Sequence, residues 1–135
     1  MRFLTVQAYL LVFIGGGIGA ALRHAVNVVL GREFGTAFPF HTLFANVTGS
    51  LVMGVLAAYF GLRMGSPQWL RLFLTTGILG GYTTFSTFSL DSIVLWERGQ
   101  YGWAAAYVVG SVAASLAGVL LGAMLVRLVN EGALT

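Results

Sequence analysis

Residues 80–89, Gly-Gly-Tyr-Thr-Thr-Phe-Ser-Thr-Phe-Ser (GGYTTFSTFS), form a polar interruption in a chain made largely of Leu, Val, Ala and Gly. Two glycines followed by Tyr-Thr-Thr favour an unwound segment over a continuous helix. In a membrane, unwound backbone persists only where it is buried in protein or lines a cavity, and its freed carbonyl groups are suited to holding a cation such as Na⁺. The stretch therefore predicts a transmembrane helix that is broken near Gly80 to Thr84.

Composition identifies the chain as a membrane protein. Of its 135 residues 58% are hydrophobic and only 8% are charged, whereas soluble domains are about one quarter charged. The chain has no cysteine, which excludes disulfides, thiolate metal sites and thiol redox chemistry. Its net charge of +3 comes from arginines placed singly along the chain, a pattern that argues against a nucleic-acid partner.

Four apolar runs are long enough to cross the bilayer, which takes about 20 helical residues. We predict an all-α integral membrane protein with a single domain over residues 1–135, and read the first run as a span because it is too long for a signal-peptide core. The four predicted spans are roughly Phe3 to Leu30, Phe40 to Gly61, Trp69 to Trp96 and Trp103 to Val129.

The distribution of arginines gives a weak instruction for orientation. With four spans, both termini lie on the same side of the membrane. That side carries four arginines, and the other side carries two, or three if Arg23 reaches the surface. So small a bias predicts a chain that can insert in both orientations.

Small residues spaced four apart allow close approach of helices in lipid. In a protein with so scant an interior they favour association with a second copy, although each pair could equally pack the helices of one subunit. The pairs are Gly15 and Gly19, Ser50 and Gly54, Gly77 and Gly81, and Gly118 and Gly122.

Polar residues inside spans are costly and are candidates for function. Asn46, in the second span, either hydrogen-bonds another helix or offers its amide donors to an anion. Tyr107, Ser111 and Ser115 recur every four residues and place three hydroxyls on one face of the fourth span. A serine can also return its hydroxyl to its own backbone, but three in register indicate a polar track.

The other candidates have competing interpretations. Arg23 either snorkels to the interface or attracts anions at a pore mouth. His24 and His41 lie near span ends without a metal-ligand spacing, and Asp91 is the one acid that does not fall in a loop or at a span end.

Phe85 and Phe88 lie three apart, so they share a helix face. Contact with lipid or core packing is the ordinary role of such residues. However, the hydroxyl-rich neighbourhood and the positive ring edges also suit the passage of a small anion.

Three segments together resemble the Fluc, or CrcB, family of fluoride channels. They are GGGIGAALR in the first span (residues 15–23), TLFANVTGS in the second (residues 42–50) and GGYTTFSTFS in the third. The similarity runs in order over all four spans. It departs at His41, where the family commonly has glycine, and at Asp91, where it usually has glutamate.

The resemblance implies a multi-pass protein of the bacterial inner membrane that releases fluoride passively and gives fluoride resistance. Its subunits would form antiparallel, dual-topology homodimers with two pores and a central structural Na⁺. The implied pore residues are Asn46, Phe85, Phe88, Tyr107, Ser111 and Ser115, with Arg23 and Asp91 near an entrance. Main-chain carbonyls of Gly80 and Thr83 from both subunits would hold the Na⁺.

Two rival functions come from other classes. A small multidrug exporter also has four short helices, but it needs a carboxylate embedded in its first span, and the predicted span has none. A non-transporting membrane scaffold would show no ion flux. An enzyme is not expected, because the polar residues supply no set of nucleophile, base and orienting group.

Overall fold

The computed structural model describes residues 2–63 and 65–132, with side chains from residue 6 onward. The side chain of Arg2, one of the arginines on the terminal side, is therefore outside the described part. Every regular element in this part is helical. The elements are α1 (Arg2–Phe34), α2 (Phe40–Leu62), α3 (Gln68–Arg71), the π-helix η1 (Leu72–Leu79), α4 (Gly80–Tyr82), α5 (Phe85–Glu97) and α6 (Tyr101–Gly132).

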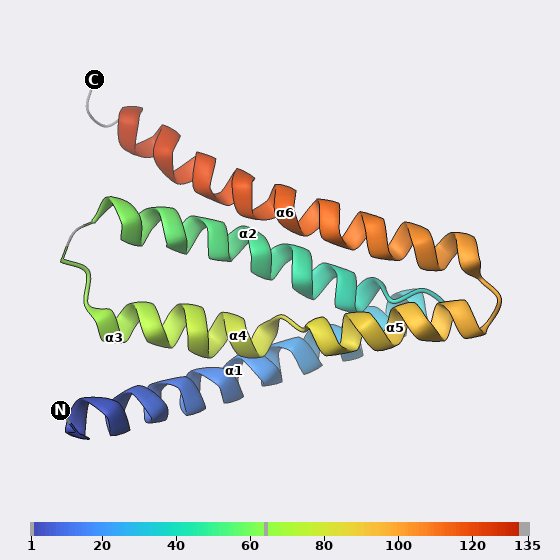
Figure 1. Cartoon of the computed structure of the whole chain (residues 1–135), viewed down its shortest axis with the longest axis horizontal. Coiled ribbons are helices and arrows are strands. Elements are labelled where there is room, and N and C mark those ends of the chain that lie inside the picture. Colours follow the sequence, from blue (N-terminus) through green and yellow to red (C-terminus); the bar gives the residue numbers. More distant parts are fainter. Residues whose placement is uncertain (1, 64, 133–135) are drawn as a thin grey trace.

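Three of these helices are long and apolar enough to cross a membrane: Val6–Phe34 within α1, then α2 and α6. The third predicted span is divided among the shorter pieces α3, η1, α4 and α5, which follow one another along a single line (Figure 1). α2 ends one residue from its predicted bound, whereas α1 continues four residues beyond Leu30.

The helices alternate in direction (Figure 1). α1 and the line from α3 to α5 run one way, and α2 and α6 run the other way, parallel to each other. The turn between α2 and α3 lies at the same end as both termini, and the turns after α1 and α5 lie at the opposite end. The division of the arginines between the two sides of the membrane assumes this same placement of the termini and turns.

Glycines hold α1 close to η1 and α4. A Cβ on Gly19 would overlap the carbonyl oxygen of Ile78, and a Cβ on Gly81 would overlap that of Gly16. Gly54 and Gly122 play the same part between α2 and α6, since a Cβ there would overlap the carbonyl oxygens of Val119 and Leu51 respectively. These glycines thus bring helices of one chain together, which is one of the two interpretations that their spacing left open; association with a second copy stays a prediction.

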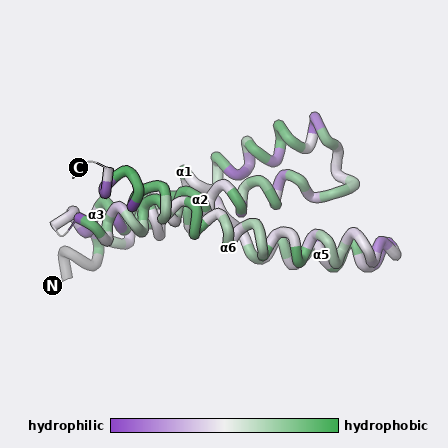
Figure 2. The backbone as a smooth tube through the Cα atoms, turned by 90° about the horizontal axis from the view of Figure 1, so that it is seen from above, coloured by the Kyte–Doolittle hydropathy of each residue, from purple (hydrophilic) through white to green (hydrophobic). Residues whose placement is uncertain are grey.

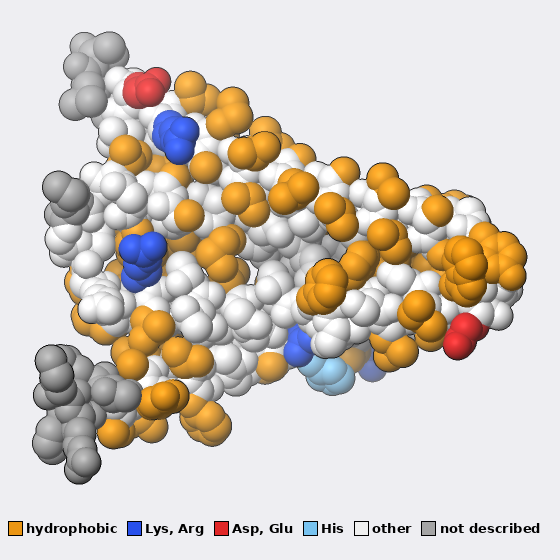
Figure 3. Space-filling model, viewed as in Figure 1, with side chains coloured by type: hydrophobic (Ala, Val, Ile, Leu, Met, Phe, Trp, Pro, Cys, Tyr) orange, Lys and Arg blue, Asp and Glu red, His pale blue; other side chains and the backbone are white. Residues whose placement is uncertain are grey.

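The surface is apolar almost everywhere. The long helices are mostly hydrophobic along their length (Figure 2), and one whole face of the molecule carries few charged side chains (Figure 3). The buried core is small by comparison, and it includes a cluster of Phe88, Leu95, Ala104 and Tyr107. Such a surface suits contact with lipid or with another apolar protein surface.

The helix break lies later than its glycines. Gly80 and Gly81 are helical, and the extended residues are Thr83 (φ −83°, ψ 157°) and Thr84 (φ −152°, ψ 122°). The expectation of unwinding at the two glycines was therefore wrong, because Gly81 is needed for close packing against α1. The interruption itself falls within the predicted range.

Candidate functional site

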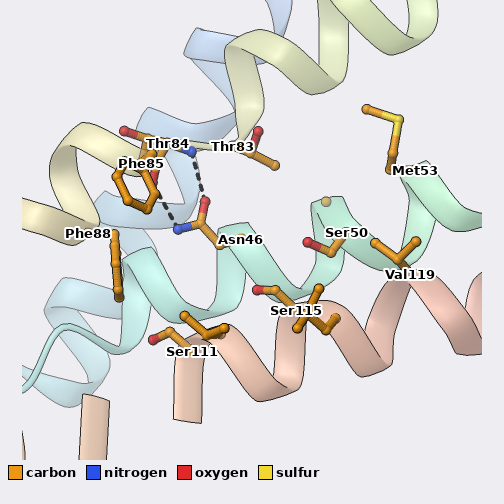
Figure 4. Close-up of a pocket in the computed structure, with 13 residues that line it drawn as sticks. Asn46, Ser50, Met53, Thr83, Thr84, Phe85, Phe88, Ser111, Ser115 and Val119 are labelled. Atoms are coloured by element: carbon orange, nitrogen blue, oxygen red, sulfur yellow. Dashed lines mark hydrogen bonds between the residues drawn. The ribbon is translucent and has the colours of Figure 1, made fainter. Parts of the chain in front are cut away.

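The helix break, α2, the start of α5 and the middle of α6 border an open cavity of about 350 Å³ (Figure 4). Its described lining carries hydroxyls, one amide and two phenylalanine rings, and it contains no charged side chain. The lining residues are Asn46, Gly49, Ser50, Met53, Thr83, Thr84, Phe85, Phe88, Ser111, Val112, Ser115, Leu116 and Val119.

Asn46 fixes the backbone of the break. Its Nδ2 donates to the carbonyl oxygen of Thr84 (2.9 Å), and its Oδ1 accepts from the Thr84 N–H (2.8 Å), as Figure 4 shows. The amide therefore satisfies both backbone groups of an extended residue that no helix can satisfy. One N–H of Asn46 is left over, so of the two donors expected for an anion one is committed to the protein.

Thr84 in turn begins α5. Its Oγ1 accepts from the N–H of Thr87 (3.2 Å), which makes it a side-chain N-cap. As a result two carbonyls lose their usual helical donors. The Thr84 N–H bonds Asn46 instead of the carbonyl of Gly80, and the Thr87 N–H bonds the Thr84 hydroxyl instead of the carbonyl of Thr83.

A second contact between α2 and the third span lies two residues further along α2. The hydroxyls of Thr48 and Tyr82 are 3.0 Å apart, and Thr48 also donates to the carbonyl of Phe44 (2.7 Å). Sequence reasoning missed this pair. Thr48 follows Asn46 by two residues, so the TLFANVTGS segment supplies polar groups to both sides of the break.

The two phenylalanines occupy different environments. Phe88 is 9% exposed, whereas Phe85 is 77% exposed, and their ring centroids are 5.4 Å apart. Phe88 also contacts Tyr107, at 5.4 Å between ring centroids. Both rings line the cavity, as expected from their shared helix face, but Phe85 lies at its open side and Phe88 is embedded in the core.

The predicted hydroxyl track on α6 is divided. Ser111 and Ser115 line the cavity, and the buried Ser111 Oγ has no hydrogen-bond partner in the described part of the chain. Tyr107 lies outside the lining and donates its hydroxyl to Asp91 Oδ2 (3.2 Å). Its proposed place in a pore stays a prediction.

Asp91, which is partly exposed, accepts the hydrogen bonds of a polar cluster whose other members are buried. Its Oδ2 also accepts from the hydroxyl of Thr42 (2.7 Å), so helices α2, α5 and α6 meet at this one carboxylate. Thr42 and Tyr107 are each 1% exposed. Sequence reasoning singled out Asp91 but missed Thr42, which the pairing of an intramembrane acid with hydroxyl donors could have suggested.

Three other candidates do not reach the cavity. Arg23 lies half-buried on α1, a helix that contributes nothing to the cavity lining. His24 and His41 belong to α1 and α2 respectively. Among the described residues no three His, Asp or Glu side chains gather as a metal site would require.

Fold and cavity together define a small multi-pass membrane protein with an uncharged, largely apolar cavity that carries an amide, hydroxyls and two phenylalanine rings beside a helix break. The family model "CrcB-like protein, Camphor Resistance (CrcB)" matches residues 10–123, and the chain belongs to this family.

Close relatives are named as fluoride-specific ion channels. The chain is 62% identical, over 92% of its length and all of the relative, to the "Fluoride-specific ion channel FluC" of Rhodopseudomonas palustris (strain BisB5). It is 56% identical to "Fluoride-specific ion channel FluC 2" of Nitrobacter hamburgensis, over 88% of the chain and 96% of the relative. It is 50% identical to the FluC of Granulibacter bethesdensis, over 94% of the chain and all of the relative.

Proposed function

We propose that the protein is a fluoride channel, not an enzyme, and that the 350 Å³ cavity forms part of its anion path. The observation that carries the proposal is the chemistry of the lining: Asn46, Phe85, Phe88, Ser111 and Ser115 meet in one cavity without a carboxylate to repel an anion. The names of the relatives above support fluoride as the ion.

The mechanism follows from what a small, strongly hydrated anion needs. Fluoride must exchange its water for protein donors and still be able to leave, so weak sites in series suit it better than one fixed positive charge. The partnerless Ser111 hydroxyl, the remaining N–H of Asn46 and the positive ring edges of Phe85 and Phe88 supply such sites. Passage is passive, so trapped fluoride leaves down its own gradient.

The working unit in this proposal is an antiparallel homodimer with two pores. Phe85 is largely exposed in the single chain, and the cavity that it lines is open on that side. A second copy of the chain would cover this ring and close the cavity. The described arginines support dual topology, since Arg63, Arg71 and Arg127 lie at one end and Arg32 and Arg98 at the other, a nearly even division.

A structural Na⁺ fits the break, held by main-chain carbonyls of Gly80 and Thr83 from each subunit. The fit rests on the two carbonyls that lose their helical donors when Thr84 bonds Asn46 and caps α5. Gly80 is also exposed on the surface of the single chain. Bound there, Na⁺ would neutralise the partial negative charge of these carbonyls and join the two breaks. We place the dimer in the bacterial inner membrane.

The deciding experiment is fluoride efflux from liposomes that contain the purified protein, followed with a fluoride electrode and repeated with chloride. Release of fluoride without release of chloride is the expected result. The multidrug-exporter alternative predicts proton-coupled uptake of cations instead. Absence of fluoride release from well-folded dimers would favour the scaffold alternative and contradict the channel.

A further inference from the structure

A second cavity, of about 420 Å³, lies between the last turns of α2 and α6. Its wall is largely aliphatic and includes Val55, Leu62 and Val126, while Arg63 and Asn130 are its main polar groups. An apolar cavity with a cation at the end of two parallel membrane helices has the layout of a lipid site, in which a chain is buried and a headgroup lies at the interface.

The position of this cavity separates it from the anion path. Val55 follows Asn46 by nine residues, which is about two and a half helical turns, so the two side chains leave α2 on opposite faces. On α6 the two cavities share a face, since Val126 follows Val119 by seven residues, or about two turns, so along this helix they differ only in their position. Lipid is favoured over another subunit by the aliphatic wall together with the cation at the helix ends.

Arg63 is available to a phosphate group. Its guanidinium carbon lies 4.9 Å from the centroid of the Tyr59 ring, which holds the side chain at the cavity without using its N–H donors. Within the described part of the chain no carboxylate pairs with it. Its backbone N–H caps α2 by donating to the carbonyl of Tyr59 (3.2 Å).

The C-terminal ends of the two helices place a partial negative charge near the positive charge of Arg63. α2 and α6 both end beside this cavity, and the C-terminal carbonyls of a helix carry a partial negative charge. These carbonyls disfavour an anion on its own but suit an ammonium group next to the phosphate. We propose that the cavity binds one phospholipid with an ammonium headgroup, of the phosphatidylethanolamine type: one acyl chain in the aliphatic wall, the phosphate on Arg63 and the ammonium at the helix ends.

Native mass spectrometry of the full-length protein, released from detergent with added phosphatidylethanolamine, tests this assignment. We expect wild type to retain one lipid per chain and Arg63→Gln to reduce the retained fraction at least fivefold. The matched control Arg71→Gln removes an exposed arginine from the same end of the molecule, outside the cavity, and should bind as wild type does. Equal retention by Arg63→Gln and wild type would overturn the proposal.

Filling the cavity gives a second, independent variant. Val126→Trp should block the acyl chain and lower retention, whereas Val109→Trp, at a 68% exposed position of the same helix outside the cavity, should not. Diacylglycerol with the same chains lacks the phosphate and should be retained less. Stronger retention of phosphatidylglycerol would overturn the ammonium assignment. If the Arg63 and Val126 variants change the ratio of monomer to dimer but not the bound lipid, the face is a subunit contact and the proposal fails.

Discussion

Asn46 and Thr84, 38 positions apart, exchange two hydrogen bonds of 2.9 and 2.8 Å, so that one side chain of α2 satisfies both backbone groups of one extended residue in the third span. This relationship makes the helix break a defined conformation. It also explains why an asparagine lies within a membrane-spanning helix: its amide carries a donor and an acceptor in the geometry of a peptide group.

Asn46→Leu should therefore damage both structure and transport. Removing two intramembrane hydrogen bonds, worth on average about 0.6 kcal/mol each, should lower the free energy of unfolding by about 1–2 kcal/mol and release the Thr84 backbone. We expect fluoride efflux to fall at least tenfold and the Thr84 amide to exchange hydrogen faster. Ser50→Ala, on the same face of α2 but without a bond to the break, is the matched control for stability and for exchange at Thr84. Unchanged exchange at Thr84 would show that Asn46 does not hold the break.

Phe85→Ile and Phe88→Ile should separate transport from stability. Both rings line the cavity, so each variant should sharply reduce fluoride efflux while leaving the dimer intact. Only Phe88 is buried against Tyr107, so only its variant should also lose about 1 kcal/mol of unfolding free energy. The measurements are efflux from liposomes and unfolding in detergent, with Phe44→Ile on α2, outside the lining, as control. Normal efflux in both variants would sink the ring-edge proposal.

Gly81→Ala tests the packing role that replaces unwinding as the reason for this glycine. Its Cβ would overlap the carbonyl of Gly16, so α1 and α4 must move apart, at a cost of about 1–3 kcal/mol. Gly17→Ala adds the same atom where no other group lies within 4 Å and should be neutral or slightly stabilising. Thermal unfolding in detergent compares the two variants, and equal stability would contradict close packing at Gly81.

The glycines at the break show which features of it could be predicted from the sequence and which could not. A break within residues 80–84 could be predicted, because Gly-Gly followed by β-branched hydroxyl residues is a poor transmembrane helix. Its position at Thr83–Thr84 could not be predicted, because that depends on where Asn46 and Thr48 of another helix meet the third span. Likewise, four-residue glycine spacing indicates that helices approach closely, but it does not say whether the partner helix belongs to the same chain.

In the candidate site too, some features could be predicted from the sequence and others could not. Helical spacing correctly placed Ser111 and Ser115 together, as well as Phe85 and Phe88, since residues three and four apart share a face. Tyr107 continues that spacing, yet its longer side chain reaches Asp91 instead of the cavity. The cluster of Thr42, Asp91 and Tyr107 joins three helices, and contacts between helices distant in sequence are not encoded in any local pattern.

Asp91→Ala should be among the more destabilising substitutions of the polar residues inside the predicted spans. It leaves the buried hydroxyls of Thr42 and Tyr107 without their acceptor, and a buried unsatisfied group costs about 1–3 kcal/mol. In a double-mutant cycle with Thr42→Val we expect a coupling energy of at least about 1 kcal/mol, measured by unfolding in detergent. Ser92→Ala removes a hydroxyl that donates to the carbonyl of Phe88 in its own helix, so it should change stability little. Additive effects of Asp91→Ala and Thr42→Val would mean that the short Thr42 contact stabilises nothing.

Ser111→Ala should have the opposite profile, with transport lost and stability kept. The Ser111 hydroxyl is buried, lines the cavity and has no partner among the described residues. Its burial therefore has a desolvation free energy that no hydrogen bond offsets. Replacement by alanine should leave the free energy of unfolding unchanged or raise it by up to about 1 kcal/mol. Fluoride efflux should nevertheless fall several-fold, because a passing anion loses a hydrogen-bond donor that none of the described residues uses. Ser111→Thr retains the hydroxyl and should restore most of the efflux, provided that the cavity accepts one more methyl group. If Ser111→Ala transports fluoride at the wild-type rate, the hydroxyls of α6 do not contribute to the anion path, and the path must rely on Asn46 and the two phenylalanine rings.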